Sequence, residues 1–319
     1  MTLTGSGTIN ATQANGLVPL VARLSATNAN ITLADTATNL LGTTGSVAAL
    51  ARATSLTSDA TVTAAQQAAL TAMRGFAVAN GVHLTVSDTL AALQGLTAQQ
   101  RAAATEVVLR DTLPHLLAAA GLPSGTSAIV VQLDQGTYTA AQAAQIAALA
   151  SDGVTMTLQP TGGATEMVVT DTVQAILANV VRLTALAAHG PIVVTPTNQG
   201  VTLSAASAAA LAGLSALDIG AARIAVSDTG EAVTAARDAL FGADVLSITI
   251  TGGVFRGSVD QLLDPRLHLG TTPVVSVARF ATLAVASTPA AHLASDATVS
   301  AAQMISLSLL PGFSVDPGV

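Results

Sequence analysis

The sequence predicts an α/β repeat solenoid, in which strand–helix repeats of about 25 residues place a parallel sheet on one face and helices on the other. Two short phrases that recur along the chain, and a core of small aliphatic residues, support this prediction. A doubly wound α/β fold is the structural alternative. We expect residues 1–319 to form a single array, and a seam between 1–158 and 167–319 would fall at 159–166.

The first recurring phrase is an apolar run that ends in Asp-Thr. It occurs as ITLADT (31–36), LTVSDT (84–89), VVLRDT (107–112), MVVTDT (167–172) and IAVSDT (224–229). Alternation of β-branched and polar residues is typical of a half-buried strand. Aspartate is a strong N-cap, because its carboxylate accepts the free N–H groups of a helix. We therefore expect helix N-caps at Asp35, Asp88, Asp111, Asp171 and Asp228.

The second phrase is a capping residue followed by small residues. It occurs as INATQ (9–13), VTAAQ (62–66), LTAQQ (96–100), YTAAQ (138–142), LSAAS (203–207) and VSAAQ (299–303). Its best-preserved copies are SDATVTAAQ (58–66) and SDATVSAAQ (295–303). The expected N-caps are Asn10, Thr63, Thr97, Thr139, Ser204 and Ser300, with a weaker one at Ser258. Alanine-rich helices after these caps would pack at short interaxial distances.

The helix expected after the fourth Asp-Thr phrase is the longest. In TVQAILANVVRLTALAA (172–188) an apolar stripe is expected to contain Val173, Ile176, Leu177, Val180, Val181 and Leu183.

The two phrases alternate, and most steps between caps are 24 to 33 residues. The exception is Asp88 to Thr97 to Asp111, where Thr97 falls within or between short helices. Further strands are expected at 129–133, 154–158, 192–196, 246–250 and 274–278. Strands that regularly alternate with helices predict parallel pairing, because each helix carries the chain back to the start of the next strand.

The composition narrows the class of function. Half of the residues are hydrophobic but only 2% are aromatic, 9% are charged, and the net charge is −7 without any lysine. Nucleic-acid binding is therefore not expected, since basic and aromatic residues are scarce. Two copies of a protein with few surface charges repel each other only weakly, so such a surface tolerates association. Cysteine is absent, which excludes disulfides and thiol chemistry.

No catalytic, cofactor-binding or metal-binding residues are predicted, and the chain is not expected to be an enzyme. The five histidines are scattered, and no His-Glu-x-x-His motif occurs. The segment GGVFRG (252–257) lacks the phosphate-loop lysine and favours a turn. The repeated aspartates could bind calcium if they lined up, but each is alone in its loop, so capping is the favoured interpretation.

Nothing at the N-terminus resembles a cleavable signal peptide, and no transmembrane segment is expected. The expected location is extracellular or on the cell surface, with the cytoplasm as the alternative.

The alternation of VTDTVQAILANVVRLTALAAHGPIVVTPT with VTLSAASAAALAGL resembles repeats of large secreted and surface proteins of alphaproteobacteria. Those proteins carry arrays of strand, Asp-Thr, helix, strand, TAAQ and helix, sometimes beside calcium-binding RTX repeats. The resemblance covers about residues 8–304 and is clearest in 166–240. It implies a structural role outside the cell. This chain is short for that group and has no RTX glycine-rich tract.

The sequence therefore favours a self-assembling structural protein, such as a subunit of a surface filament, surface layer or biofilm matrix. Its partner would be another copy of itself, joined head to tail through the segments 1–12 and 304–319. Attachment to a cell surface would accompany this role. The alternative is a solenoid binding or adhesion module for a protein or polysaccharide ligand.

Overall fold

The computed structural model describes residues 2–23, 25–43, 51–150, 153–218, 223–243, 245–270, 290–293, 299–310 and 313–315. Its contacts divide the chain into two compact units. The N-terminal unit consists of Met1–Gln135 and Gln145–Thr165, and the C-terminal unit consists of Gly136–Ala144 and Glu166–Val319. The strand expected at 274–278 lies outside the described residues.

The N-terminal unit contains two parallel sheets. Its strands are β1 (Thr2–Ile9), β2 (Ser25–Asp35), β3 (Ala53–Leu56), β4 (Ala60–Val62), β5 (Phe76–Val78), β6 (Leu84–Asp88), β7 (Glu106–Thr112), β8 (Thr126–Leu133) and β10 (Thr155–Pro160). They form the sheets β1-β2-β3-β5 and β10-β8-β7-β6-β4. The helices are α1 (Ala11–Gly16), α2 (Ala37–Leu41), α4 (Ala64–Thr71), α5 (Leu90–Gln94), α6 (Ala98–Ala102) and α7 (Leu113–Leu117), with a 3₁₀-helix η1 (Val18–Arg23).

The C-terminal unit contains three parallel sheets. Its strands are β9 (Thr137–Tyr138), β11 (Met167–Asp171), β12 (Ile192–Pro196), β13 (Val201–Leu203), β14 (Ile224–Asp228), β15 (Ser247–Ile250), β16 (Val254–Gly257), β17 (Leu267–Leu269), β18 (Ala290–Leu293) and β19 (Ser314–Val315). They form β12-β11-β9, β13-β14-β15-β17 and β16-β18-β19. The helices are α8 (Ala140–Leu149), which begins in this unit, α9 (Val173–Ala187), α10 (Ala205–Ala212), α11 (Gly230–Gly242), α12 (Val259–Leu262) and α13 (Ala301–Ser308).

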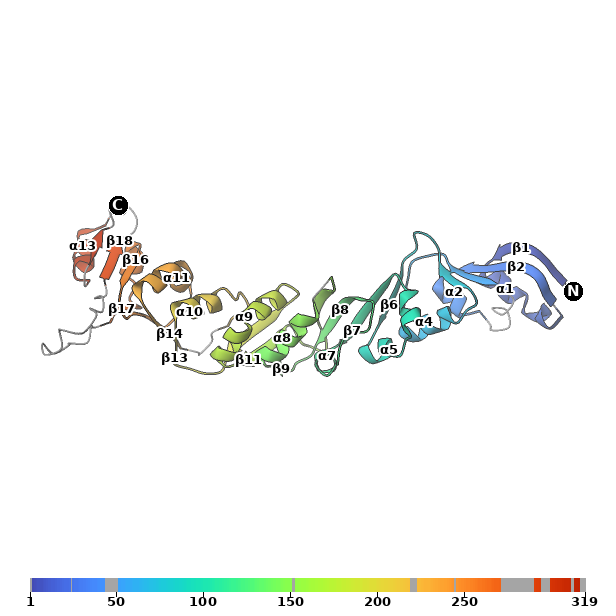
Figure 1. Cartoon of the computed structure of the whole chain (residues 1–319), viewed down its shortest axis with the longest axis horizontal. Coiled ribbons are helices and arrows are strands. Elements are labelled where there is room, and N and C mark those ends of the chain that lie inside the picture. The colour runs from blue at the N-terminus through green and yellow to red at the C-terminus, as the bar shows by residue number, and fades with distance from the viewer. Residues whose placement is uncertain are drawn as a thin grey trace, which may run out of the picture. The chain divides into compact units, whose positions relative to one another are not determined.

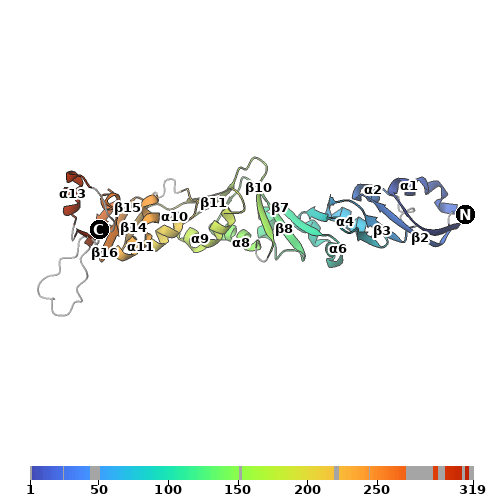
Figure 2. The same cartoon turned by 90° about the horizontal axis from the view of Figure 1, so that it is seen from above.

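Neighbouring strands are always separated along the chain by at least one helix, and all the described strand pairs are parallel. In Figure 1 β1 lies beside β2, and in both views β7 lies beside β8 (Figure 1, Figure 2). Each helix thus returns the chain so that the next strand joins the previous one in the same direction. The mixed α/β class with parallel pairing is confirmed, but the strands form five sheets rather than one.

The core consists mainly of Leu, Val, Ile and Ala that alternate along the strands. In β7 Val107 and Leu109 are buried, and in β8 Ile129, Val131 and Leu133 are buried. Such period-two burial gives each strand one face in the core, as the sequence predicts. Phe255 is the largest fully buried side chain in the described part of the chain, and its ring stacks 5.8 Å from that of Phe241.

Most expected strands begin and end within one to three residues of their predicted positions. The short strands directly before the small-residue helices were missed. These are β4, β9, β13 and β16. Strands of two to four residues are too short to show alternation. One residue of the apolar stripe in α9 was also placed wrongly, because Val181 is 79% exposed. Each residue turns a helix by about 100°, so Val181 falls opposite Ile176 and Leu183, which are buried.

The start of α11 allows a matched test of this packing. A Cβ at Gly230 would lie 2.3 Å from the carbonyl carbon of Val254 in β16, whereas a Cβ at Gly242, at the other end of α11, would meet nothing within 4 Å. We expect Gly230→Ala to lower the free energy of unfolding by about 1–3 kcal/mol or more. Gly242→Ala should be neutral or stabilising by up to about 1 kcal/mol. Equal effects in denaturant titrations would contradict this packing.

Candidate functional site

No cluster of side chains that could hold a metal ion is found among the described residues. In those ranges no three His, Cys, Asp or Glu side chains come together. His115 approaches one acid, with its Nδ1 2.7 Å from Asp111 Oδ1, and 70% of its side chain is exposed. The segment GGVFRG forms a bend followed by β16, and its Val254 N–H donates to Glu231 Oε1 at 2.9 Å. The Val254 N–H, which a bound phosphate would need as a donor, is therefore already bonded to Glu231.

One arrangement recurs in both units and involves the aspartates of the Asp-Thr phrases. In each, Oδ1 accepts the N–H of the following Thr at 2.7–2.8 Å. Oδ2 accepts the N–H of the first residue of an earlier helix at 2.9–3.0 Å. We call these five residues the bridging aspartates: Asp35 to Ala11, Asp88 to Ala64, Asp111 to Leu90, Asp171 to Ala140 and Asp228 to Ala205.

Parallel register explains why each carboxylate meets that N–H. Ile9 of β1 is paired with Leu33 of β2, so Ala11 lies beside Asp35 two residues further on. At that level the first strand has already turned into α1, whereas β2 is still extended. The first N–H groups of a helix have no partner within the helix, and the carboxylate beside them supplies an acceptor. The other four bridges keep the same two-residue offset.

The expected N-caps at Asp35, Asp88, Asp111, Asp171 and Asp228 are wrong by one residue. The N-caps are the threonines that follow them: Thr36, Thr89, Thr112, Thr172 and Thr229. The aspartates still belong to their strands, and each caps the helix before it rather than the helix it precedes. Of the five threonines, only Thr112 makes no side-chain capping bond.

The expected caps of the second phrase are confirmed. The side chains of Asn10, Thr63, Thr97, Thr139, Ser204, Ser258 and Ser300 each accept the N–H three residues on. In all but Ser204, the glutamine at that third position accepts the N–H of the cap in return. This reciprocal capping box was missed, although its signature, Ser or Thr followed three residues later by Gln, is visible in the sequence.

These bonds explain why the two phrases alternate. A capping box satisfies the N–H of the cap and of the third helical residue but leaves the first helical N–H open. In α1, α4, α8 and α10 that N–H is taken by the bridging aspartate at the end of the next Asp-Thr strand. Asn198 has the same role for α9, where its Oδ1 accepts the Val173 N–H at 2.8 Å. The starts of these helices are therefore completed by a residue at, or just after, the end of the next paired strand.

The bridges also hold two of the carboxylates in their charged form. Hydrogen bonds from Asn39, Ala11 and Thr36 lower the pKa of Asp35 below its ordinary value of 3.8 despite partial burial. At Asp111 burial acts to raise the pKa, but bonds from His115, Leu90 and Thr112 outweigh it and lower the pKa. A carboxylate surrounded by N–H donors is satisfied without a cation, which favours capping over calcium binding.

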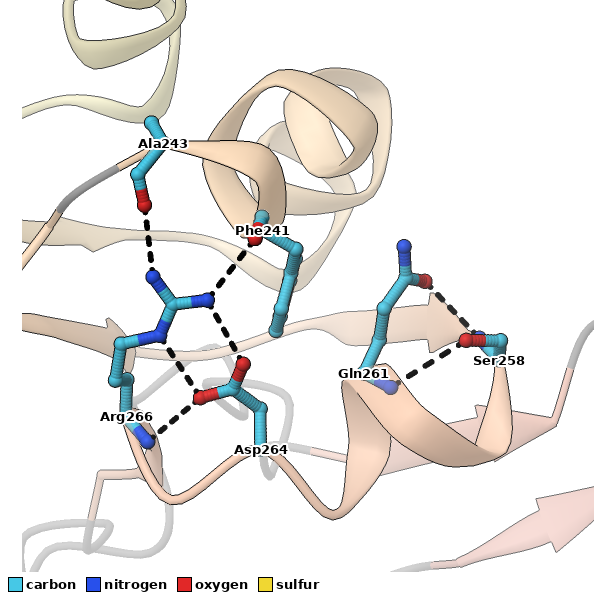
Figure 3. Close-up of polar contacts among 6 residues, drawn as sticks. All are labelled: Phe241, Ala243, Ser258, Gln261, Asp264 and Arg266. Carbon is cyan, nitrogen blue, oxygen red and sulfur yellow. Dashed lines mark hydrogen bonds and ion pairs between the residues drawn. The ribbon is translucent and has the colours of Figure 1, made fainter.

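Some helix C-termini are completed in a similar way by arginine. Arg266 donates from Nη1 to Ala243 O at 2.8 Å and from Nη2 to Phe241 O at 3.0 Å, at the end of α11 (Figure 3). Its guanidinium also pairs with Asp264 at 2.8 Å, and this bond lowers the pKa of Asp264. In the N-terminal unit, Arg101 donates to the carbonyl oxygen of Leu93 at 3.0 Å, within α5. Cations at helix C-termini complement the helix dipole.

Exposed large apolar side chains gather at two places. The first is η1, where Val18 is 38% and Leu20 is 41% exposed; we call these two residues the N-terminal patch. The second is α13 and its flank, where Met304, Ile305, Leu309 and Val315 are 46–77% exposed; we call these four the C-terminal patch. In addition, β1 forms an edge of its sheet and pairs in the described structure with β2 alone.

The comparisons with known proteins identify no relative. No protein-family model, curated protein or solved structure matches the chain. Among the described helices, none combines the length and the hydropathy that a membrane crossing requires.

Removing Asp111, the most buried bridging aspartate, should show how much such a bridge contributes to the free energy of unfolding. Asp111 is 3% exposed, and its loss would leave the N–H groups of Leu90 and Thr112 without their acceptor. We expect Asp111→Ala to lower the free energy of unfolding by about 1–3 kcal/mol in denaturant titrations. Asp238→Ala is the control, because the Asp238 side chain is 86% exposed. A loss no larger than the control's would show that the bridge is not stabilising.

The lowered pKa values of Asp35 and Asp111 predict acid sensitivity. Near pH 4 the unfolded chain binds more protons than the folded one, so stability present above that pH is lost as pH falls toward the folded pKa. The free energy of unfolding should therefore decline below about pH 4. In Asp111→Asn, which cannot titrate at this position, the decline should be shallower. An identical pH profile in wild type and variant would contradict this assignment.

Proposed function

We propose that this chain is a self-assembling structural protein that acts outside the cell, as a subunit of a surface filament, surface layer or biofilm matrix. In this proposal the strand–helix segments form a solenoid of repeats of about 25 residues. Copies join head to tail through the first and last repeats. The observation that carries the proposal is the concentration of exposed apolar side chains in those two regions.

Two features support a solenoid over a doubly wound fold. Paired strands come from nearby strand–helix segments, and a doubly wound fold would place its strands in one large sheet, whereas the described strands form five small ones. The bridging aspartates also connect residues only 21–31 positions apart. Contacts limited to sequence neighbours are the defining property of solenoids.

The distribution of exposed apolar residues supports assembly through the terminal segments. Of the eight large hydrophobic residues that are exposed in the described structure, six belong to the N-terminal or C-terminal patch. The other two are Val181 and Leu246. Clustered exposed apolar residues mark interaction surfaces, whereas single ones are ordinary. Ile305 and Leu309 lie four residues apart, so they share one face of the last helix.

The kind of contact follows from the positions of the patches. They belong to different parts of the chain, so the C-terminal patch of one copy would meet the N-terminal patch of the next. Such a heterologous contact leaves a free patch at each end and continues into a filament unless it closes into a ring. The low charge supports association, since only 9% of residues are charged. The extracellular location is supported by the resemblance to secreted repeat proteins.

Assembly can be tested with substitutions at exposed positions. We expect wild-type protein to form concentration-dependent polymers by negative-stain microscopy and light scattering. The double variant Ile305→Glu/Leu309→Glu should stay monomeric with an unchanged circular dichroism spectrum, because buried carboxylates would oppose the contact. Val181→Glu is the matched control, since Val181 is 79% exposed but lies outside both patches; it should still polymerise.

A mixing experiment tests the head-to-tail arrangement. Leu20→Glu protein keeps an intact C-terminal patch, and Ile305→Glu/Leu309→Glu protein keeps an intact N-terminal patch. Each alone should be monomeric, whereas an equimolar mixture should form heterodimers and nothing larger. A wild-type chain that is monomeric at every concentration would refute assembly. Dimers in either variant alone would refute the heterologous contact.

A further inference from the structure

The segment between Asp88 and Asp111 departs from the regular pattern and forms a pocket. Elsewhere in the N-terminal unit a single α-helix separates paired strands, but here both α5 and α6 lie between β6 and β7. Helix α6 lies in contact with α4 (Figure 2). Residues of both helices and of β5 line a pocket of about 320 Å³. Its lining includes Thr71, Phe76, Thr97, Gln99 and Gln100, with two alanines.

The wall formed by α6 is held in place from two sides. Gln67 Nε2 of α4 donates to the backbone oxygen of Gln100 at 2.8 Å. Arg101 donates to the backbone oxygen of Ser124 at 3.0 Å and to that of Leu93. The capping box of Thr97 and Gln100 fixes the start of the helix. The pocket is therefore formed before any ligand arrives, which lowers the entropic cost of binding.

The lining offers neutral hydrogen-bonding groups and one aromatic ring. Threonine hydroxyls and glutamine amides supply both donors and acceptors, and no charged side chain belongs to the lining. Phe76 is half-buried, and it is one of only six aromatic residues in the whole chain, five Phe and one Tyr. A charged ligand would find no counter-ion here, whereas a ligand with several hydroxyls and one apolar face would be satisfied.

A buried glutamine of α4 supports the wall of this pocket. Gln67 is fully buried, and its Oε1 has no hydrogen-bond partner in the described protein. The amide orientation is fixed, because Nε2 must face the carbonyl oxygen of Gln100. The backbone oxygen of Gln67 also accepts from Thr71 at 2.8 Å. Gln67 is thus bonded to two lining residues, Gln100 and Thr71, and helps to hold them in place.

We propose that this pocket binds a single neutral sugar residue. The ring of Phe76 would contact the apolar C–H face of the sugar, and the exposed side chains of Gln99 and Thr97 would bond its hydroxyls. The volume is at the lower end of the range of about 300–1,000 Å³ for small-molecule sites, which suits one sugar residue rather than a longer chain. This site lies within the N-terminal unit and is independent of the two apolar patches. It would give an extracellular assembly a means of holding surface glycans.

Saturation-transfer NMR with irradiation of the aromatic protons tests this proposal on the full chain. The probes are glucose, galactose and N-acetylglucosamine at millimolar concentration, with galacturonate as the charged comparison. We expect transfer to the ring protons of at least one neutral sugar and weaker transfer to galacturonate. Phe76→Ala should abolish the signal. Phe313→Ala, a half-buried phenylalanine of the C-terminal unit, should leave it unchanged.

Two further variants separate binding from stability and from assembly. Gln99→Ala removes an exposed amide of the lining and should weaken affinity at least threefold while the protein remains folded by circular dichroism. The double variant Ile305→Glu/Leu309→Glu should still bind sugar, so failure of assembly and failure of this site are distinguishable. Absence of transfer to all three neutral sugars, an unchanged signal in Phe76→Ala, or preference for galacturonate would each overturn the proposal.

Discussion

The carboxylate that bridges two successive strand–helix segments is the interaction on which the rest of the structure depends. One oxygen receives the N–H at the start of its own helix, and the other receives the first N–H of the helix before it. A parallel pair brings these groups together only in one register, because a shift by one residue would turn the aspartate to the opposite face. The bridge therefore fixes register and caps the preceding helix, while it also holds the N-cap threonine of the next one. Few other side chains could do both.

This use of charge explains a composition that is otherwise unusual. Five of the 18 acidic residues are bridging aspartates, and Arg101 and Arg266 donate to backbone carbonyls at or near helix C-termini. Acidic side chains lie near helix starts and basic ones near helix ends, as the helix dipole favours. Much of the sparse charge thus satisfies backbone groups inside the fold. What remains for the surface is mostly hydroxyls, amides and alanine, which repel another copy only weakly.

The sequence predicted the class of structure well because the signals are local and repeated. A few consecutive residues are enough to recognise the alternation in runs such as 167–171 and the cap before each Ala-rich helix. The bond from Ala11 to Asp35 could not be predicted in this way, because the two residues are 24 positions apart and are brought together only by the register of the strands. The pocket between α4 and α6 was missed for the same reason: Phe76 and Gln99 look unremarkable until a helix places them together. The sequence showed only that the Asp88–Asp111 step was irregular.

In this arrangement the starts of several helices are completed by a residue at, or just after, the end of the next paired strand, so those segments depend on their successors. In the solenoid that we propose, stability would therefore be a sum of segments and of the contacts between neighbours. Where no described segment covers a helix, its apolar residues remain exposed. The patches at Val18 and Leu20 and at Ile305 and Leu309 fit this logic. In an assembly the next copy would cover these patches. Contacts between molecules would then stabilise the outer segments in the same way as contacts between neighbouring segments stabilise the inner ones.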